Sequence, residues 1–168
     1  TTLPVTLEDI IYHTKAVVRG NTNAFIVADM PFLSYQLSTV QAKESAGRLI
    51  KEGLMDAVKL EGGIEYIDQV LAIITAGIPV MGHIGLKPQS VLIESGYKIQ
   101  GKTSDSALKI YQDALALADA GVFALVLEGV PEELAQIITQ KIKIPTIGIG
   151  AGKFCNGQIQ VLHDIIGL

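Results

Sequence analysis

With 168 residues, the chain is long enough to form one domain with a sizeable core. Its content of 49% hydrophobic and 18% charged residues fits a well-buried α/β protein and excludes a disordered chain. The net charge of −4, without any run of lysine or arginine, argues against nucleic acid as a partner.

The sequence also carries no sign of a membrane or of secretion. No apolar stretch approaches the roughly 18 residues that a membrane span needs, so we expect no membrane association. The first residues lack the basic and apolar segments of a secretory signal. The single cysteine, Cys155, excludes an internal disulfide and fits a reducing compartment. We therefore expect a cytoplasmic protein.

Hydrophobic spacing and turn residues predict that helices and strands alternate along the chain. Thr6 with Asp9, and Ser38 with Gln41, form capping-box patterns that begin the first two helices. The predicted helices cover residues 6–20, 38–53 and 67–77, a segment through Leu108, Tyr111 and Leu115 that ends at 120–121, and a segment from Pro131 whose buried stripe is Leu134, Ile137 and Ile138. The predicted strands cover residues 24–28, 57–61, 79–83, 123–127, 145–149 and 158–163, and residues 95–106 form a surface excursion.

Regular alternation of strands and helices predicts a parallel sheet, either doubly wound or closed into a barrel. Polar residues end strand after strand, and no glycine-rich dinucleotide fingerprint follows an early strand. Both features favour a (β/α)8 TIM barrel. A full barrel needs eight strands and about 250 residues. We therefore expect residues 1–168 to form a single partial TIM-barrel domain, without the first two strands and the C-terminal tail.

The strand over residues 57–61 predicts the floor of a site. Side chains alternate faces along a strand, so Val58 and Leu60 share one face while Lys59 and Glu61 share the other. An apolar pair suits packing under a helix, whereas a cation and a carboxylate are costly to bury unless they are paired or bind a ligand. The alternative interpretation is a surface ion pair on an edge strand.

Three acidic residues end predicted strands: Asp29, Glu61 and Glu128. In a barrel they converge at one mouth, where oxygen ligands favour Mg²⁺ over Zn²⁺. Crowding raises the pKa of one carboxyl, which lets it act as a general base. Alternatively, each acid only caps the following helix, which is most credible for Glu128. His83 follows a strand and could donate to a substrate oxygen, or it could be a structural histidine.

Two further features of the sequence have weaker interpretations. Residues 147–152 (IGIGAG) resemble a phosphate-cradling loop, although tight-turn geometry explains these glycines equally well. Cys155 lies in a polar loop without an evident histidine partner, so we interpret it as structural.

Taken together, seven segments resemble the ketopantoate hydroxymethyltransferase family, in the order of that family and across essentially the whole chain. These segments are residues 1–7 (TTLPVTL), 27–32 (VADMPF), 58–63 (VKLEGG), 82–90 (GHIGLKPQS), 96–102 (GYKIQGK), 127–131 (LEGVP) and 147–152 (IGIGAG). The resemblance implies a TIM-barrel enzyme of pantothenate biosynthesis. It would transfer a hydroxymethyl group from 5,10-methylenetetrahydrofolate to 3-methyl-2-oxobutanoate with the help of Mg²⁺.

The same resemblance implies a role for five residues. Asp29 corresponds to a metal and substrate ligand, and Glu61 to a metal-site carboxylate. Lys59 corresponds to the lysine that binds the keto acid, His83 to a histidine that contacts the substrate, and Glu128 to the general base. The family also implies a homo-oligomer.

The family pattern also includes elements that this sequence lacks. Two more strands would precede residue 1, and the second would supply a metal-binding aspartate and a substrate-binding serine. If the molecule begins at residue 1, we expect metal binding to be crippled and catalysis to be lost. If the missing part lies outside this sequence or is supplied by another chain, the expected activity stands. Two other functions stay open. One is a Mg²⁺-dependent keto-acid lyase barrel of the phosphoenolpyruvate mutase type, and the other is a truncated barrel that serves only as a scaffold.

Overall fold

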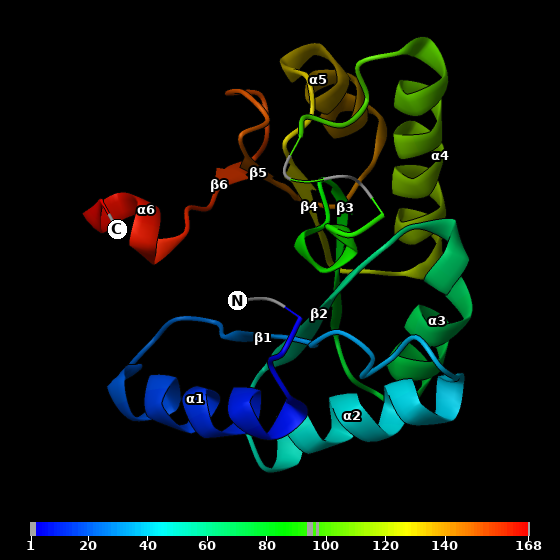
Figure 1. Cartoon of the computed structure of the whole chain (residues 1–168). Helices are drawn as coiled ribbons and strands as arrows, with labels where there is room; N and C mark the ends of the chain where they lie inside the picture. Colours follow the sequence, from blue (N-terminus) through cyan, green and yellow to red (C-terminus); the bar gives the residue numbers. More distant parts are fainter. Residues whose placement is uncertain (1–2, 94–95, 97, 168) are drawn as a thin grey trace.

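The structure, a computed structural model, describes residues 3–93, 96 and 98–167. It contains an open six-stranded sheet in which every neighbouring pair is parallel (Figure 1). The strands are β1 (Val27–Asp29), β2 (Ala57–Glu61), β3 (Val80–Gly85), β4 (Ala124–Glu128), β5 (Thr146–Ile149) and β6 (Gly157–Gln158). The helices are α1 (Leu7–Gly20), α2 (Thr39–Lys51), α3 (Ile67–Thr75), α4 (Ser104–Ala120), α5 (Glu132–Lys141) and α6 (Leu162–Ile166), with short 3-10 turns η1 (Ile64–Tyr66) and η2 (Pro88–Ser90).

The order of the strands distinguishes the two predicted architectures. From β1 to β6 the spatial order equals the order in the chain, with no reversal. A doubly wound sheet reverses direction at a switch point, whereas a barrel adds each strand beside the previous one. The prediction of a partial (β/α) barrel is confirmed.

The helices α2, α3 and α4 pack against one face of the sheet, and this face forms the core. Val58 and Leu60 of β2 are fully buried in it. Lys59 and Glu61 point to the opposite face, where they line a cavity. The predicted alternation along β2 is therefore confirmed, and β2 lies between β1 and β3 rather than at an edge.

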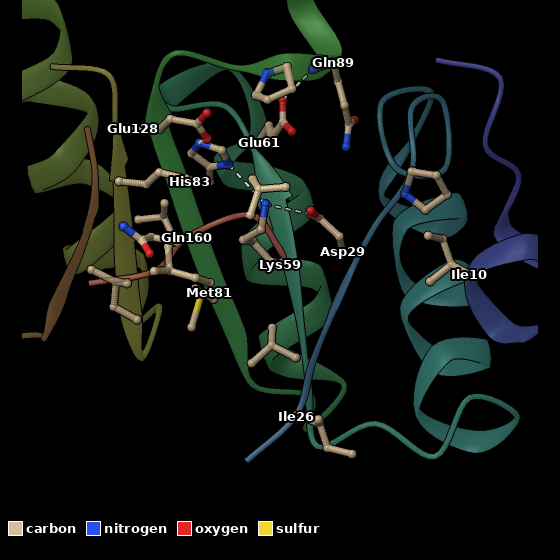
Figure 2. Close-up of a pocket in the computed structure, with 18 of the residues that line it drawn as sticks. Ile10, Ile26, Asp29, Lys59, Glu61, Met81, His83, Gln89, Glu128 and Gln160 are labelled. Atoms are coloured by element: carbon tan, nitrogen blue, oxygen red, sulfur yellow. Dashed lines mark hydrogen bonds and ion pairs between the residues drawn. The ribbon is translucent and has the colours of Figure 1, made fainter. Parts of the chain in front are cut away.

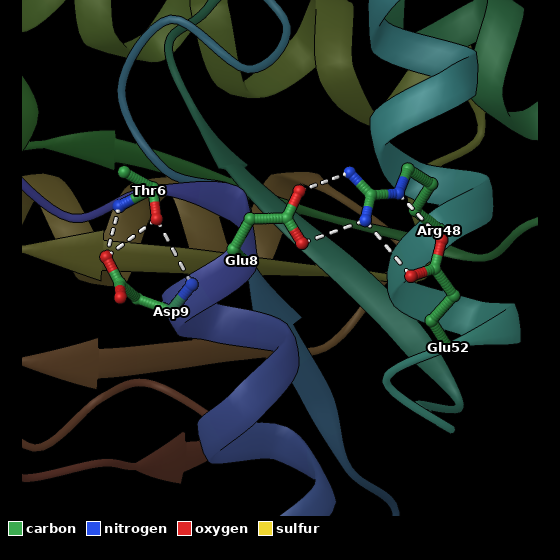
Figure 3. Close-up of polar contacts among 5 residues, drawn as sticks. All are labelled: Thr6, Glu8, Asp9, Arg48 and Glu52. Carbon is green, nitrogen blue, oxygen red and sulfur yellow. Dashed lines mark hydrogen bonds and ion pairs between the residues drawn. The ribbon is translucent and has the colours of Figure 1, made fainter.

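Helix starts follow local side-chain chemistry. At α1 the Thr6 hydroxyl accepts from the Asp9 amide, and the Asp9 carboxylate accepts from the Thr6 amide, so the predicted capping box is complete (Figure 3). At α2 only half of the box forms. Ser38 accepts from the Gln41 amide, but the Gln41 side chain bonds Leu33 and Leu37 instead of the Ser38 amide. The loop before α2 brings these main-chain groups within reach of Gln41.

Two predicted strands are shorter in the structure. The strand predicted over residues 24–28 begins only at Val27, because the side chains of Asn21 and Asp56 bond the main chain of Ala24 and Ile26. The strand predicted over residues 158–163 is limited to β6 and is followed by α6.

Two further predictions need correction. Ile137, predicted in the buried stripe of α5, is 54% exposed, and Ala135 takes its place. The excursion predicted over residues 95–106 lies partly outside the described residues, and α4 already begins at Ser104. In the part of the chain that the structure describes, no helix is both long and apolar enough to cross a membrane.

Candidate active site

Four adjacent strands end at one rim and carry the predicted site residues. Asp29 pairs in register with Lys59, Glu61 with His83, and Gly85 with Glu128. All five predicted site residues, namely Asp29, Lys59, Glu61, His83 and Glu128, line one cavity of about 670 Å³ (Figure 2). The convergence that the strand ends predict is therefore present, while the role of each residue stays a prediction.

A line of polar contacts crosses these strands. The Lys59 Nζ lies 2.7 Å from Asp29 Oδ1 and 3.1 Å from His83 Nδ1 (Figure 2). On the far side of the ring, His83 Nε2 lies 3.1 Å from Glu128 Oε2. Because a lysine ammonium group only donates, Nδ1 must accept, and the proton of a neutral ring then lies on Nε2. Nε2 is close to the Glu128 carboxylate but makes no well-aligned hydrogen bond to it.

The surroundings of His83 keep the ring neutral. The residue is only 2% exposed, and burial disfavours its charged form. Burial first, and the nearby Lys59 ammonium second, lower the pKa of His83 below its usual value, although Glu128 opposes this shift. We therefore expect a neutral His83 ring between the Lys59 cation and the Glu128 carboxylate.

Glu61 has the most perturbed carboxyl of the cavity. Its Oε2 accepts a hydrogen bond of 2.9 Å from the main-chain amide of Gln89. Burial raises the pKa of Glu61 to about 7, with smaller contributions in the same direction from Asp29 and Glu128. The sequence predicts that crowding of acids raises one pKa; in the structure, burial is the larger cause and crowding the smaller.

Asp29 and Glu61 are the predicted metal ligands. Within the described residues, no group of three or more acidic, histidine or cysteine side chains is arranged to hold a metal ion. Mg²⁺, however, is commonly bound through one or two carboxylates while it keeps several waters. Asp29 is half-exposed, and Glu61 is a buried carboxyl that a neighbouring cation would help to ionise. Both carboxylates line the cavity, and their chemistry as oxygen ligands is compatible with Mg²⁺, while their role as metal ligands stays a prediction.

Two residues that sequence reasoning missed support this rim. Tyr35 and Gln89 are buried, and both bond Glu61 through main-chain or side-chain groups. The available signal was a polar residue, Gln89, in the short 3-10 turn that follows the strand carrying His83. Tyr35 gave no comparable signal, because it follows a turn of irregular structure.

The glycine-rich loop after β5 is a tight turn. Gly150 and Gly152 have positive φ angles of 59° and 76°. The Glu132 side chain occupies the space where a Cβ of Gly152 would lie, which places an acid beside the loop. These observations support turn geometry rather than a phosphate cradle. The partly buried Cys155 packs against the core, in keeping with a structural role.

Comparison with known proteins shows close sequence relatives. The chain is 58% identical over 167 residues to the 3-methyl-2-oxobutanoate hydroxymethyltransferase of Clostridium kluyveri, covering 99% of this chain and 60% of that protein. It is 59% identical over 167 residues to the enzyme of the same name from Thermoanaerobacter sp. strain X514, covering 99% of this chain and 61% of that protein. The chain thus spans about 60% of the length of these relatives.

Solved structures of low sequence identity share the fold. A candidate phosphonomutase from Burkholderia cenocepacia J2315 matches with a TM-score of 0.70 and 14% identity, over 96% of this chain and 73% of that chain. A candidate lyase/mutase from the same organism matches with a TM-score of 0.64 and 12% identity, over 97% of this chain and 58% of that chain. At this identity the likeness concerns the fold alone.

The match to a family model decides the family. The model described as ketopantoate hydroxymethyltransferase covers residues 1–168, the whole chain. The strand-end residues that carry the resemblance also surround a single cavity. On this evidence, the chain belongs to the ketopantoate hydroxymethyltransferase family.

Proposed function

We propose that the protein transfers a hydroxymethyl group from 5,10-methylenetetrahydrofolate to 3-methyl-2-oxobutanoate, giving 2-dehydropantoate for pantothenate biosynthesis. The main support is the cavity itself, where a lysine, a histidine and three carboxylates from four adjacent strands face one space. Family membership supplies the substrates, since relatives carry the name 3-methyl-2-oxobutanoate hydroxymethyltransferase. The roles of the individual residues, a cytoplasmic location and a homo-oligomeric state stay predictions.

Lys59 supplies the positive charge that an anionic keto acid needs. Its side chain is only 17% exposed, and its Nζ is already held by Asp29 and His83. A substrate carboxylate would take the exposed side of this ammonium group. Because the cavity is largely apolar away from the strand ends, the two methyl groups of the substrate have apolar surface to contact.

In this proposal, Glu128 removes the proton. The C3–H of 3-methyl-2-oxobutanoate lies next to its carbonyl and is the acidic hydrogen of this substrate. Removal by the Glu128 carboxylate leaves a carbon nucleophile that forms the new carbon–carbon bond. Overall, the methylene carbon is released from two folate nitrogens and bonds to C3 of the keto acid. One water molecule supplies the hydroxyl group. The proton from C3 and the second proton of the water end on the two folate nitrogens.

Asp29 and Glu61 would hold Mg²⁺ at the same rim. When bound there, the metal would act as a Lewis acid and polarise the substrate carbonyl. Lys59 would orient the substrate carboxylate, and His83 would keep the Glu128 carboxylate directed into the cavity.

The test is a product assay with three components. The protein, shown to be folded by circular dichroism, is incubated with 3-methyl-2-oxobutanoate, 5,10-methylenetetrahydrofolate and Mg²⁺, and 2-dehydropantoate is measured by mass spectrometry. Product that requires the folate donor supports the proposal. Cleavage of a keto acid without folate would instead support a lyase of the phosphoenolpyruvate mutase type. A folded protein that neither forms product nor binds the keto acid would overturn the proposal and favour a scaffold.

A further inference from the structure

A buried cluster of hydrogen bonds surrounds Glu61 on the side away from Lys59. Its members are Tyr35 from the loop after β1, Gln89 from η2 after β3, and the main chain of Met30. Tyr35 is 1% exposed, Gln89 7% and Met30 0%. Polar groups at such depth are costly unless they are paired, so their partners reveal what the cluster holds.

The Tyr35 hydroxyl is bonded to both main-chain polar groups of Glu61, the carbonyl and the amide. Its hydroxyl donates to the Glu61 carbonyl over 2.8 Å and accepts from the Glu61 amide over 3.2 Å. The same hydroxyl lies 3.4 Å from Gln89 Oε1. Tyr35 thus fixes the last residue of β2 and faces the side chain of Gln89.

Gln89 binds the Glu61 side chain through its own main chain. Its amide N–H donates to Glu61 Oε2 over 2.9 Å, as the dashed line in Figure 2 shows. Its side-chain Nε2 donates to the Met30 carbonyl over 2.8 Å. Because the side chain is tied to the loop after β1, the main chain of Gln89 is held against the Glu61 carboxylate.

These contacts tie Glu61 to the loops that follow β1 and β3. The Tyr35 hydroxyl has one proton, which it donates to the Glu61 carbonyl, so its 3.4 Å approach to the acceptor Gln89 Oε1 is not a second full hydrogen bond at the same time. Tyr35 therefore holds the Glu61 main chain, and the Gln89 amide holds the Glu61 carboxylate. With Oε2 held and the main chain fixed, the direction of the second carboxylate oxygen, Oε1, is also set.

We propose that Tyr35 and Gln89 are positioning residues that hold the Glu61 carboxylate in the orientation that a divalent cation needs at the rim of this cavity. Neither side chain is a metal ligand in this arrangement. The effect on cation binding rests on the proposed function of Glu61, whereas the effect on the Glu61 conformation does not. The two can therefore be tested separately.

The test uses Tyr35→Phe, which removes only the hydroxyl, and Gln89→Met, which keeps the length of the side chain without its amide. Crystal structures of both variants report the conformation of Glu61. Calorimetric titration with Mn²⁺ at pH 7 reports cation affinity. Ile138→Val is the matched control, because Ile138 is fully buried in α5 and belongs to none of the elements that carry the cluster. Thermal unfolding of all variants measures the loss of stability.

Support would be a displaced or multiply oriented Glu61 carboxylate in both variants, with Mn²⁺ affinity at least tenfold weaker than in Ile138→Val. A merely structural role would lower the melting temperature without changing cation affinity relative to that control. An unchanged Glu61 conformation in both variants would overturn the proposal. If the unsubstituted protein binds no Mn²⁺, the metal part of the proposed function fails, and the crystal structures alone decide whether the two residues position Glu61.

Discussion

The Nε2 atom of His83 lies 3.1 Å from the Oε2 atom of Glu128, on the neighbouring strand. The other ring nitrogen lies 3.1 Å from the Lys59 ammonium group. Both nitrogens of a residue that is 2% exposed therefore lie close to charged protein groups, although Nε2 makes no well-aligned hydrogen bond. This arrangement favours a role in which His83 fixes the positions of Lys59 and Glu128. The contact with substrate that the family resemblance implies stays a prediction.

The first prediction concerns the protonation of His83. We expect ¹⁵N NMR to show a neutral ring with its proton on Nε2 at pH 7, because Lys59 can only donate to Nδ1. Burial lowers the pKa of His83 below the usual 6.5, so the ring should stay neutral when free histidine becomes charged. The His83→Gln variant assigns the signals.

The same pKa shift gives a test on stability. Below pH 6.5 the histidine becomes protonated in the unfolded chain, whereas His83 stays neutral in the folded protein. Protonation therefore favours the unfolded state, and the free energy of unfolding decreases as the pH falls. Urea unfolding at pH 7 and pH 5.5 should show a smaller loss for His83→Gln than for the unsubstituted protein. A ring with its proton on Nδ1, or one that titrates above 6.5, would contradict the assignment.

The second prediction concerns Glu61 without metal. Burial raises the pKa of its carboxyl from 4.5 to about 7. Between these values the folded state holds a proton that the unfolded state has released, so this group makes stability decrease as the pH rises. The shift corresponds to about 3 kcal/mol in the free energy of unfolding between pH 4.5 and pH 8.

Urea unfolding in EDTA at several pH values measures this effect, with Glu61→Gln as the control. The difference in the free energy of unfolding between the two proteins reports the contribution of Glu61 alone. The contribution of His83, which changes with pH in the opposite direction, is present in both proteins and cancels. We expect the unsubstituted protein to lose stability relative to Glu61→Gln as the pH rises from 5 to 8. Parallel curves for the two proteins would show that Glu61 has an ordinary pKa.

The third prediction concerns the contact between α1 and α2. Arg48 of α2 bonds Glu8 of α1 through both carboxylate oxygens, at 2.7 and 2.9 Å, and also pairs with Glu52 (Figure 3). Exposed ion pairs usually contribute little to stability, and a bidentate arginine–carboxylate pair is the geometry in which the contribution is largest. We expect Arg48→Met to lower the melting temperature by about 1–3 °C.

The salt dependence of the melting temperature distinguishes the contribution of this ion pair from that of side-chain packing. The difference between Arg48→Met and the unsubstituted protein should shrink in 1 M NaCl, because salt screens exposed charges. Lys43→Met, an exposed position on the same helix, is the matched control and should change the melting temperature less. A salt-independent loss for Arg48→Met would mean that the aliphatic part of the side chain stabilises the contact instead.

Much of the site was predictable because strands impose simple geometry. The alternation along β2 places Val58 and Leu60 on one face of the sheet and Lys59 and Glu61 on the other, independently of the loop conformations. In a parallel sheet all strands end on the same side, so acids at the ends of different strands line the same rim. These two rules locate the cavity from the sequence alone.

Tyr35 and Gln89 depend on structure that no such rule supplies. Gln89 contacts Glu61 through a main-chain amide, which any residue except proline possesses. Its identity matters only for the side-chain contacts to Met30 and Tyr35. Tyr35 reaches Glu61 across 26 residues from an irregular loop. The early end of β6 could not be predicted from the sequence either. Its pairing with β5 stops after two residues, although the alternation of apolar residues continues beyond them.

The last prediction identifies the base. In D2O with 3-methyl-2-oxobutanoate and Mg²⁺ but no folate, the protein should exchange the C3 proton for deuterium, which ¹H NMR measures. Glu128→Gln should slow this exchange by about 10²–10⁴-fold, the usual contribution of a general base, because the amide cannot accept the proton. Binding of the keto acid, measured by calorimetry, should change little, since Lys59 remains.

Glu61→Gln is the decisive comparison. Its carboxyl lines the same cavity, and a pKa of about 7 would also suit a base near neutral pH. If Glu61 only holds the cation, Glu61→Gln should weaken Mg²⁺ binding, and high Mg²⁺ should restore part of the exchange. Raising the Mg²⁺ concentration should not rescue Glu128→Gln. Should exchange survive in Glu128→Gln and vanish at every Mg²⁺ concentration in Glu61→Gln, the base would be Glu61, and the Glu128–His83 pair would only support it.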